Sequence, residues 1–216
     1  MKISAIEILT GDLAATEAFY DAVLGLEIFE RKTDRISFGV GASILTFIKG
    51  TGNPVYHFAF TIPCNQIHEA ERWIAAKAAV IKLNNEPIID FPNWNAKSVY
   101  FYDNNGNILE LIARFDLENG SDLPFGPFSL LSISEVALAT DDVSGLAKHL
   151  ISEHGLSFFS KQKQKDDFSV IGDDDGLLIL SSLHRHWFPT EVVVEKFGVK
   201  VLVENKGELI NIEHGL

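Results

Sequence analysis

An internal repeat constrains the fold of this chain more than any other feature of its sequence. Residues 3–38 align without gaps on residues 133–168, which pairs Thr10 with Thr140, Asp12 with Asp142 and Gly25 with Gly155. A different offset aligns Ala5 with His57 and brings a second strand and helix onto the first. Repeats of this kind are copies of one supersecondary unit that bury their apolar faces against one another.

The first copy shows what the unit contains. Alternating apolar residues predict a strand over residues 3–9, and Asp12 or Thr10 then stands where a helix N-cap belongs. Apolar residues at helical spacing predict a helix over 13–24, ended by Gly25 as a left-handed cap. Three short strands follow, so the unit is βαβββ. Their expected ranges are 26–31, 35–40 and 43–48.

The later copies define the expected domains. The second has a strand at 56–62, a helix at 66–79 and a closing hairpin whose strands 99–102 and 107–113 flank the turn Asp103-Asn104-Asn105-Gly106. The third spans residues 130–183, and a degraded fourth at 190–216 has strands but no convincing helix. Paired βαβββ modules predict an α+β fold in two tandem domains. These are residues 1–115 (modules 3–50 and 55–115) and 130–216, joined by a Gly-, Pro- and acid-rich linker at 116–129.

Glu110 is the anomalous residue, because it lies between Leu109 and Leu111 in an otherwise apolar strand. A buried carboxylate is costly unless it is paired or bound to a metal, and the alternative is that Glu110 faces water. The repeat sharpens this choice. At the position of His57, the first strands of the copies carry Ala5, His57 and Glu135; at the position of Glu110, the last strands carry Leu45, Glu110, Leu180 and Asn211. We expect His57 and Glu110 to converge, either as metal ligands or as an acid/base pair. The alternative is that His57 is a histidine hydrogen-bonded in the core.

The sequences ILTGDLAATEAFYDAVLGL, YHFAF and VYFYDNNGNILEL resemble the glyoxalase or vicinal-oxygen-chelate superfamily, which includes extradiol dioxygenases and bleomycin-resistance proteins. The resemblance covers most of residues 3–113 and is weaker over 130–182. It implies an open cup around one metal, or around a ligand where the metal is absent. It also implies that His57 and Glu110 stand at two metal-ligand positions.

Two departures from the family pattern affect the expected site. The family's ligand in the first strand of the first module falls at Ala5, and another falls at Leu45, so neither can bind a metal. Glu7 lies two residues from Ala5 and on the same face, so it is the expected third ligand. The resemblance therefore implies a divalent metal such as Zn, Mn, Fe or Ni, or no metal because of Ala5.

Two functions follow for the cup of residues 1–115. One is a metal-dependent lyase, isomerase or dioxygenase of unknown substrate, in which Glu110 or Glu7 moves a proton. The other is a metal-free protein that sequesters a small molecule. In either case Tyr100, Tyr102 and Trp94 are the expected pocket lining.

The second half of the chain contains fewer candidate site residues. Glu135 has no histidine beside it, so that half is interpreted as structural, with homodimer contact as one use. The segment His184-Arg185-His186-Trp187 is interpreted as a polar surface loop.

Charge and composition exclude several partners. Thirty acidic against eighteen basic residues give a net charge of −12, which argues against nucleic acid and anionic membranes as partners. No apolar run approaches the ~20 residues of a membrane helix, and the N-terminus does not have the pattern of a secretion signal. One cysteine, Cys64, fits a reducing compartment. We therefore expect a cytoplasmic protein whose partner is a small molecule.

Overall fold

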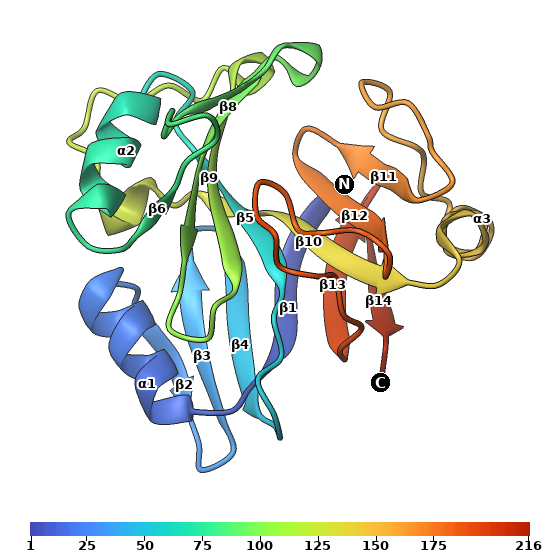
Figure 1. The fold of residues 1–216 in the computed structure, drawn as a ribbon, viewed down its shortest axis with the longest axis horizontal. Coiled ribbons are helices and arrows are strands. Elements are labelled where there is room, and N and C mark those ends of the chain that lie inside the picture. The colour runs from blue at the N-terminus through green and yellow to red at the C-terminus, as the bar shows by residue number, and fades with distance from the viewer.

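The computed structural model describes all residues 1–216, and its elements follow the predicted repeat (Figure 1). The first module holds β1 (Lys2–Thr10), α1 (Leu13–Glu17), the π-helical segment η1 (Ala18–Val23), β2 (Ile28–Arg31), β3 (Arg35–Val40) and β4 (Ser43–Lys49). The second holds β5 (His57–Ile62), α2 (Ile67–Ala75), β6 (Val80–Ile81), β7 (Ile89–Phe91), η2 (Pro92–Trp94), β8 (Ala96–Tyr102) and β9 (Ile108–Arg114). Then come η3 (Phe115–Leu117), η4 (Pro127–Ser129), β10 (Ser132–Thr140), α3 (Val143–His154), β11 (Phe168–Asp173), β12 (Gly176–Ser182), β13 (Val199–Asn205) and β14 (Glu208–His214).

Matched caps begin and end the helices of the first and third modules. The Asp12 carboxylate accepts hydrogen bonds from the backbone N–H groups of Ala14 and Ala15, both at 3.0 Å. Asp142 does the same for Gly145 at 2.8 Å. Each helix is followed by a glycine with positive φ, Gly25 at +75° and Gly155 at +61°, where a side chain would strain the backbone. The predicted cap residues are thus confirmed in both copies.

Each complete module closes in the same way, because its first strand pairs in parallel with its last. The pairs are β1 with β4, β5 with β9, and β10 with β12. The fourth module is shorter. Its two strands β13 and β14 form an antiparallel hairpin without a helix. Asn211 on β14 therefore does not occupy the position that Glu110 occupies on β9.

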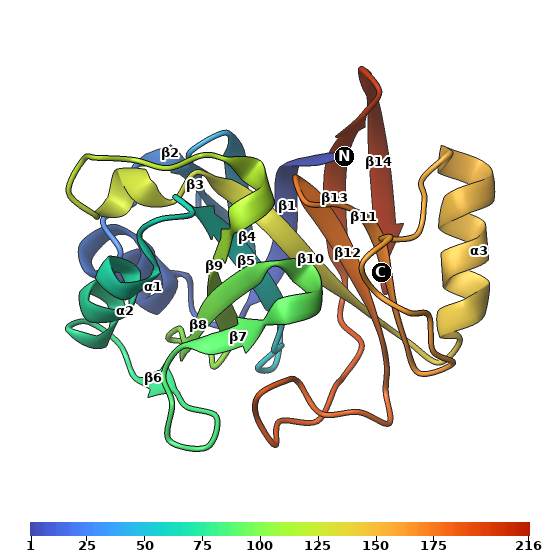
Figure 2. The ribbon, with the colours of Figure 1, turned by 90° about the horizontal axis from the view of Figure 1, so that it is seen from above.

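The modules join through their first strands. β5 pairs antiparallel with β10, and β1 pairs antiparallel with β13, so the second module faces the third and the first faces the fourth. β1 and β10 touch at Ile3 and Ile133, which makes one continuous 14-stranded sheet. Figures 1 and 2 show α1 and α2 outside one half of this sheet and α3 outside the other.

This pairing differs from the expected cup within residues 1–115, because β10 lies between β1 and β5. Near-equivalent first strands can each pair with several partners, and the apolar pattern of a strand does not specify which one it joins. The division into domains at residues 116–129 stays a prediction, since strands from both sides of that segment share the sheet.

Candidate functional site

Three neighbouring strands bring one imidazole and two carboxylates to the same place. In the strand register, Ala59 on β5 pairs with Glu110 on β9 on one side and with Glu135 on β10 on the other. His57 lies two residues before Ala59, so its side chain points to the same face of the sheet. The small Ala59 side chain leaves room between the carboxylates, and His57, Glu110 and Glu135 converge with ligand atoms within 4.8 Å of one another.

The His57 ring is held in one orientation. Its Nδ1 lies 3.0 Å from the carbonyl oxygen of Ile108, which can only accept, so Nδ1 carries the proton. The other nitrogen, Nε2, then has a free lone pair and lies 3.6 Å from Oε2 of Glu110. Burial lowers the pKa of His57, against the opposing effects of Glu135 and the Ile108 carbonyl. A neutral imidazole fixed by a backbone carbonyl is the form in which histidine binds metals.

The two carboxylates are almost fully buried, with 2% of each residue exposed. Burial raises the pKa of Glu110, while Ser98, Tyr100 and the charge of Arg114 lower it in part. Burial and the charge of Glu110 raise the pKa of Glu135, while Arg114 and His57 oppose that shift. Two buried carboxyl groups this close together can both be ionised only if positive charge lies close by.

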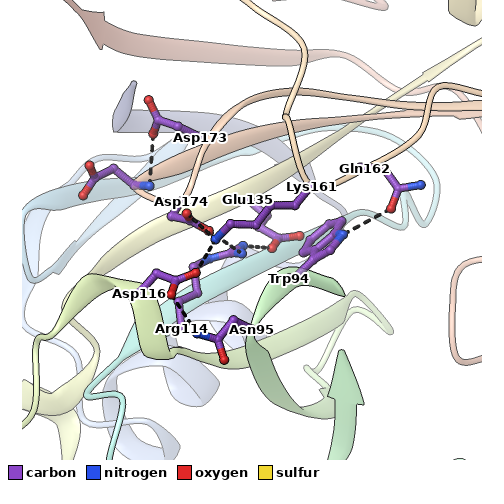
Figure 3. Close-up of polar contacts among 10 residues, drawn as sticks. Trp94, Asn95, Arg114, Asp116, Glu135, Lys161, Gln162, Asp173 and Asp174 are labelled. Carbon is purple, nitrogen blue, oxygen red and sulfur yellow. Dashed lines mark hydrogen bonds and ion pairs between the residues drawn. The ribbon is translucent and has the colours of Figure 1, made fainter. Parts of the chain in front are cut away.

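Arg114 supplies one such charge from the end of β9. It is fully buried, forms an ion pair with Glu135, and has its Cζ 5.5 Å from the centre of the Trp94 ring. Figure 3 shows the guanidinium group between Glu135 and Asp174, and the Lys161 ammonium group between Asp174 and Asp116. With the carboxylates ionised, the formal charges of Glu110, Glu135 and Arg114 sum to −1. The donor set therefore fits a divalent cation, because three buried ligands converge where negative charge is in excess.

A cavity of about 330 Å³ opens onto these residues and is lined by both halves of the chain. Besides His57, Glu110 and Glu135, six aromatic residues line it, namely Phe91, Trp94, Tyr100, Phe168, Trp187 and Phe188. The rim is polar, with Asp90, Gln162, Lys165, Arg185 and His186. The predicted polar loop at 184–187 thus contributes to the pocket, and the indole N–H of Trp187 is buried without a hydrogen-bond partner.

The structure brings together some of the residues predicted from the sequence and separates others. His57 and Glu110 meet, and Tyr100 and Trp94 line the cavity beside them. Tyr102, the last residue of β8, is not among the lining residues and packs against the apolar cluster that contains Tyr100 and Ile108.

Glu7, the expected third ligand, is not part of the cluster. Its Oε2 lies 3.4 Å from Arg35 Nη1, and its Oε1 lies 3.9 Å from Lys200 Nζ. The reason is the strand order, which puts β10 between β1 and β5.

Glu135 is the member of the cluster that sequence reasoning left out, because it interpreted the second half of the chain as structural. The signal was present, since the repeat aligns Glu135 with His57 and Ala5. The interpretation of the second half as structural rested on the absence of a histidine there. It did not consider that the third module could pair with the second.

No model of a protein family and no curated protein sequence matches this chain. Solved structures do. A proposed dioxygenase of Bacillus subtilis strain 168 superposes with a TM-score of 0.64 at 18% identity, over 100% of this chain and 85% of that one. Glyoxalase I of Zea mays superposes with a TM-score of 0.56 at 18% identity, over 84% of this chain and 66% of that one. At such identities the likeness shows the fold alone.

The chain has the glyoxalase/dioxygenase fold of the vicinal-oxygen-chelate proteins, as the resemblance implied. The expected α+β class with paired βαβββ modules is confirmed with it. None of the helices is long and apolar enough to cross a membrane.

Proposed function

We propose that this chain is a metal-dependent enzyme of the lyase, isomerase or dioxygenase type, acting on a small molecule in the cavity between its second and third modules. The observation that carries the proposal is the cluster of His57, Glu110 and Glu135 at the inner end of an aromatic cavity. One imidazole and two carboxylates are suitable ligands for Zn, Mn, Fe or Ni. Three protein ligands also match the number that catalytic metal sites use, which leaves positions open.

The chain's own residues have separate roles in this proposal. A divalent ion would act as a Lewis acid on oxygen atoms of the bound molecule. The Ile108 carbonyl keeps Nε2 of His57 unprotonated. Burial and the charges of Glu110 and Glu135 hold the pKa of Tyr100 well above its usual range, so its hydroxyl stays a hydrogen-bond donor. Tyr100 pairs directly across the sheet from Glu110, beside the place where a bound molecule would lie.

The aromatic walls favour a flat, apolar ligand body. Phe91, Trp94 and Phe188 form one contiguous aromatic group, with ring centres 6.0 Å apart for Phe91 and Trp94 and again for Phe91 and Phe188. Such walls exclude water and strengthen the electrostatic effect of the inner charges on the bound molecule.

A second candidate function is metal-free binding, in which the cavity sequesters its ligand. The ion pair between Arg114 and Glu135 favours it, because one of the three possible ligands already has a cation beside it. The homodimer expected from the sequence remains a prediction for sedimentation analysis.

Thermal unfolding with and without divalent metals separates the two candidates. A metal present at 100 times its dissociation constant stabilises the native state by about 2.7 kcal/mol, which corresponds to a rise of roughly 5–10 °C in Tm. We expect such a rise in the wild type but not in His57→Gln. The control variant His68→Gln, which replaces an exposed histidine on α2, should show the same rise as the wild type. An equal rise in His57→Gln, or none in the wild type, contradicts the metal-dependent function. Stabilisation of chelator-treated protein by flat aromatic compounds then supports the second candidate.

A further inference from the structure

Arg114 is an arginine with no exposed surface, 0% of the residue, and its position is set from several sides. Its guanidinium lies against Trp94 and forms its ion pair with Glu135 through Nη2. A fully desolvated arginine is costly unless it is paired, so Glu135 is required for it to remain there. Two other nitrogens, Nε and Nη1, have no hydrogen-bond partner. Glu135 is therefore the one residue to which Arg114 donates a hydrogen bond.

Further charged groups lie on the other side of the Arg114 guanidinium. Its Nη1 lies 3.9 Å from Oδ1 of Asp174. Lys161 in turn lies 2.5 Å from Asp174 and 2.6 Å from Asp116, which ties the turn between β11 and β12 to the segment after β9 (Figure 3). The guanidinium thus lies between two carboxylates and against an indole ring.

The atoms in this ion pair determine how Glu135 can bind a metal. Nη2 of Arg114 is bonded to Oε1 of Glu135. A carboxylate binds a metal through one oxygen or through both. While Oε1 accepts this hydrogen bond, Oε2 is the oxygen of Glu135 that is free of it, and so it is the better placed oxygen for a metal.

We propose that Arg114 is a positioning residue that restricts Glu135 to a single metal-binding oxygen and so keeps a coordination position free on the metal. This inference rests on the proposed function, since it presumes that the cluster binds a divalent ion. It assigns a specific reason for a buried arginine at the end of β9, where burial alone would favour an apolar residue.

The inference predicts the sign of the effect on metal affinity. A cation beside Glu135 repels a divalent ion, so removing the Arg114 charge strengthens metal binding. Freeing Oε1 adds a metal-oxygen bond and acts in the same direction. If Arg114 only held Glu135 in place, removing it would loosen Glu135 and weaken metal binding, because the support of a ligand is usually worth 10–100-fold in affinity. The two accounts therefore predict opposite changes.

The test uses the full chain with Mn²⁺ alone as the probe. Affinity is measured by competition with a chelator, and the enhancement of water-proton relaxation by bound Mn²⁺ counts the exchangeable waters. We expect Arg114→Met to bind Mn²⁺ about tenfold more tightly and to lose about one exchangeable water per metal. Arg114→Lys keeps a cation that can donate to the same oxygen, so its water count should return toward the wild-type value. Arg31→Met, which removes the exposed partner of Glu17, is the matched control and should change neither quantity.

Each outcome bears on the inference. A folded Arg114→Met with the wild-type water count, or with weaker Mn²⁺ binding, overturns it while leaving the metal site intact. A wild type that binds no Mn²⁺ overturns the proposed function and this inference together. Should Arg114→Met fail to fold, a crystal structure of the Mn²⁺-loaded wild type decides. The expected result is that Glu135 binds the metal through Oε2 while Oε1 accepts the hydrogen bond from Arg114. A structure in which both Glu135 oxygens bind the metal overturns the inference.

Discussion

Replacing Glu110 by glutamine should stabilise the metal-free protein, although Glu110 is buried in the centre of the sheet. Its carboxylate and that of Glu135 face each other with ligand atoms no more than 4.8 Å apart. At that separation and an effective dielectric constant of ~20, two unit charges repel by about 3.5 kcal/mol. Arg114 offsets one of these charges, and the other has no cation when no metal is bound.

The net gain is smaller than the full repulsion. Burial and mutual repulsion raise the pKa values of both carboxylates, so uptake of a proton relieves part of the cost in the wild type. Glutamine is nearly isosteric with glutamate, and its amide can donate to the free Nε2 of His57. We therefore expect Glu110→Gln to raise the free energy of unfolding of the metal-free protein at pH 8 by about 1–3 kcal/mol. That corresponds to roughly 2–12 °C in Tm.

Urea unfolding at pH 8, in chelator and in saturating Mn²⁺, measures this effect. In Mn²⁺ the order should reverse, because the wild type gains the binding free energy and Glu110→Gln lacks a charged ligand. Glu7→Gln is the control, since Glu7 is half-buried with two long ion pairs, and should change stability by less than about 1 kcal/mol in both conditions. A Glu110→Gln protein that is less stable than the wild type in chelator refutes the reasoning.

Three further predictions concern parts of the fold away from the site. Tyr20→Phe removes the 2.7 Å hydrogen bond from the Tyr20 hydroxyl to the buried Asp103 and should cost about 1–3 kcal/mol in urea unfolding; no loss would mean that Asp103 is satisfied without it. Ser43→Ala leaves the buried N–H of Ile133 without its acceptor at the junction of β1 and β10, with a similar expected cost, and an unchanged midpoint would argue against that junction. Burial lowers the pKa of His214, so its contribution is complete above the unfolded value of about 6.5 and is lost as pH falls through the folded value. His214→Gln should therefore lose less stability than the wild type between pH 7 and pH 5, and identical slopes would contradict this.

Local structure was predictable from the sequence because it depends on neighbouring residues. Asp12 and Gly25 bound a helical segment, and the turn at residues 103–106 joins two strands, because capping and positive φ are local requirements. The helix of the first module differs in one respect. It continues as a π-helical segment over Ala18–Val23, which apolar spacing alone does not reveal.

The composition of the site was only partly predictable, because it depends on which modules pair. The positions of His57 and Glu110 follow from one module, since the first and last strands are parallel neighbours in each of the three complete modules. The third member, Glu135, comes from another module through the pairing of β5 with β10. Main-chain hydrogen bonds between strands do not depend on which side chains the strands carry. The sequence therefore did not distinguish this pairing from one between β1 and β5.

Arg114 was not singled out from the sequence for a similar reason. It ends an apolar strand, where a basic residue ordinarily marks the return of the chain to solvent. The approach of β10 and of the turn at Asp174 buries it instead. Its partner lies on the other side of the linker at residues 116–129.

The central claim is that one divalent metal is bound by residues from both halves of the chain, and metal stoichiometry in matched glutamate variants tests it most directly. Wild type, Glu135→Gln and Glu7→Gln are stripped with chelator, equilibrated with Mn²⁺ by dialysis and analysed for metal. The account predicts about one Mn²⁺ per chain in the wild type and in Glu7→Gln, and a severe loss in Glu135→Gln. Retention of the metal in Glu135→Gln together with its loss in Glu7→Gln would contradict the account and restore the site to the first half of the chain.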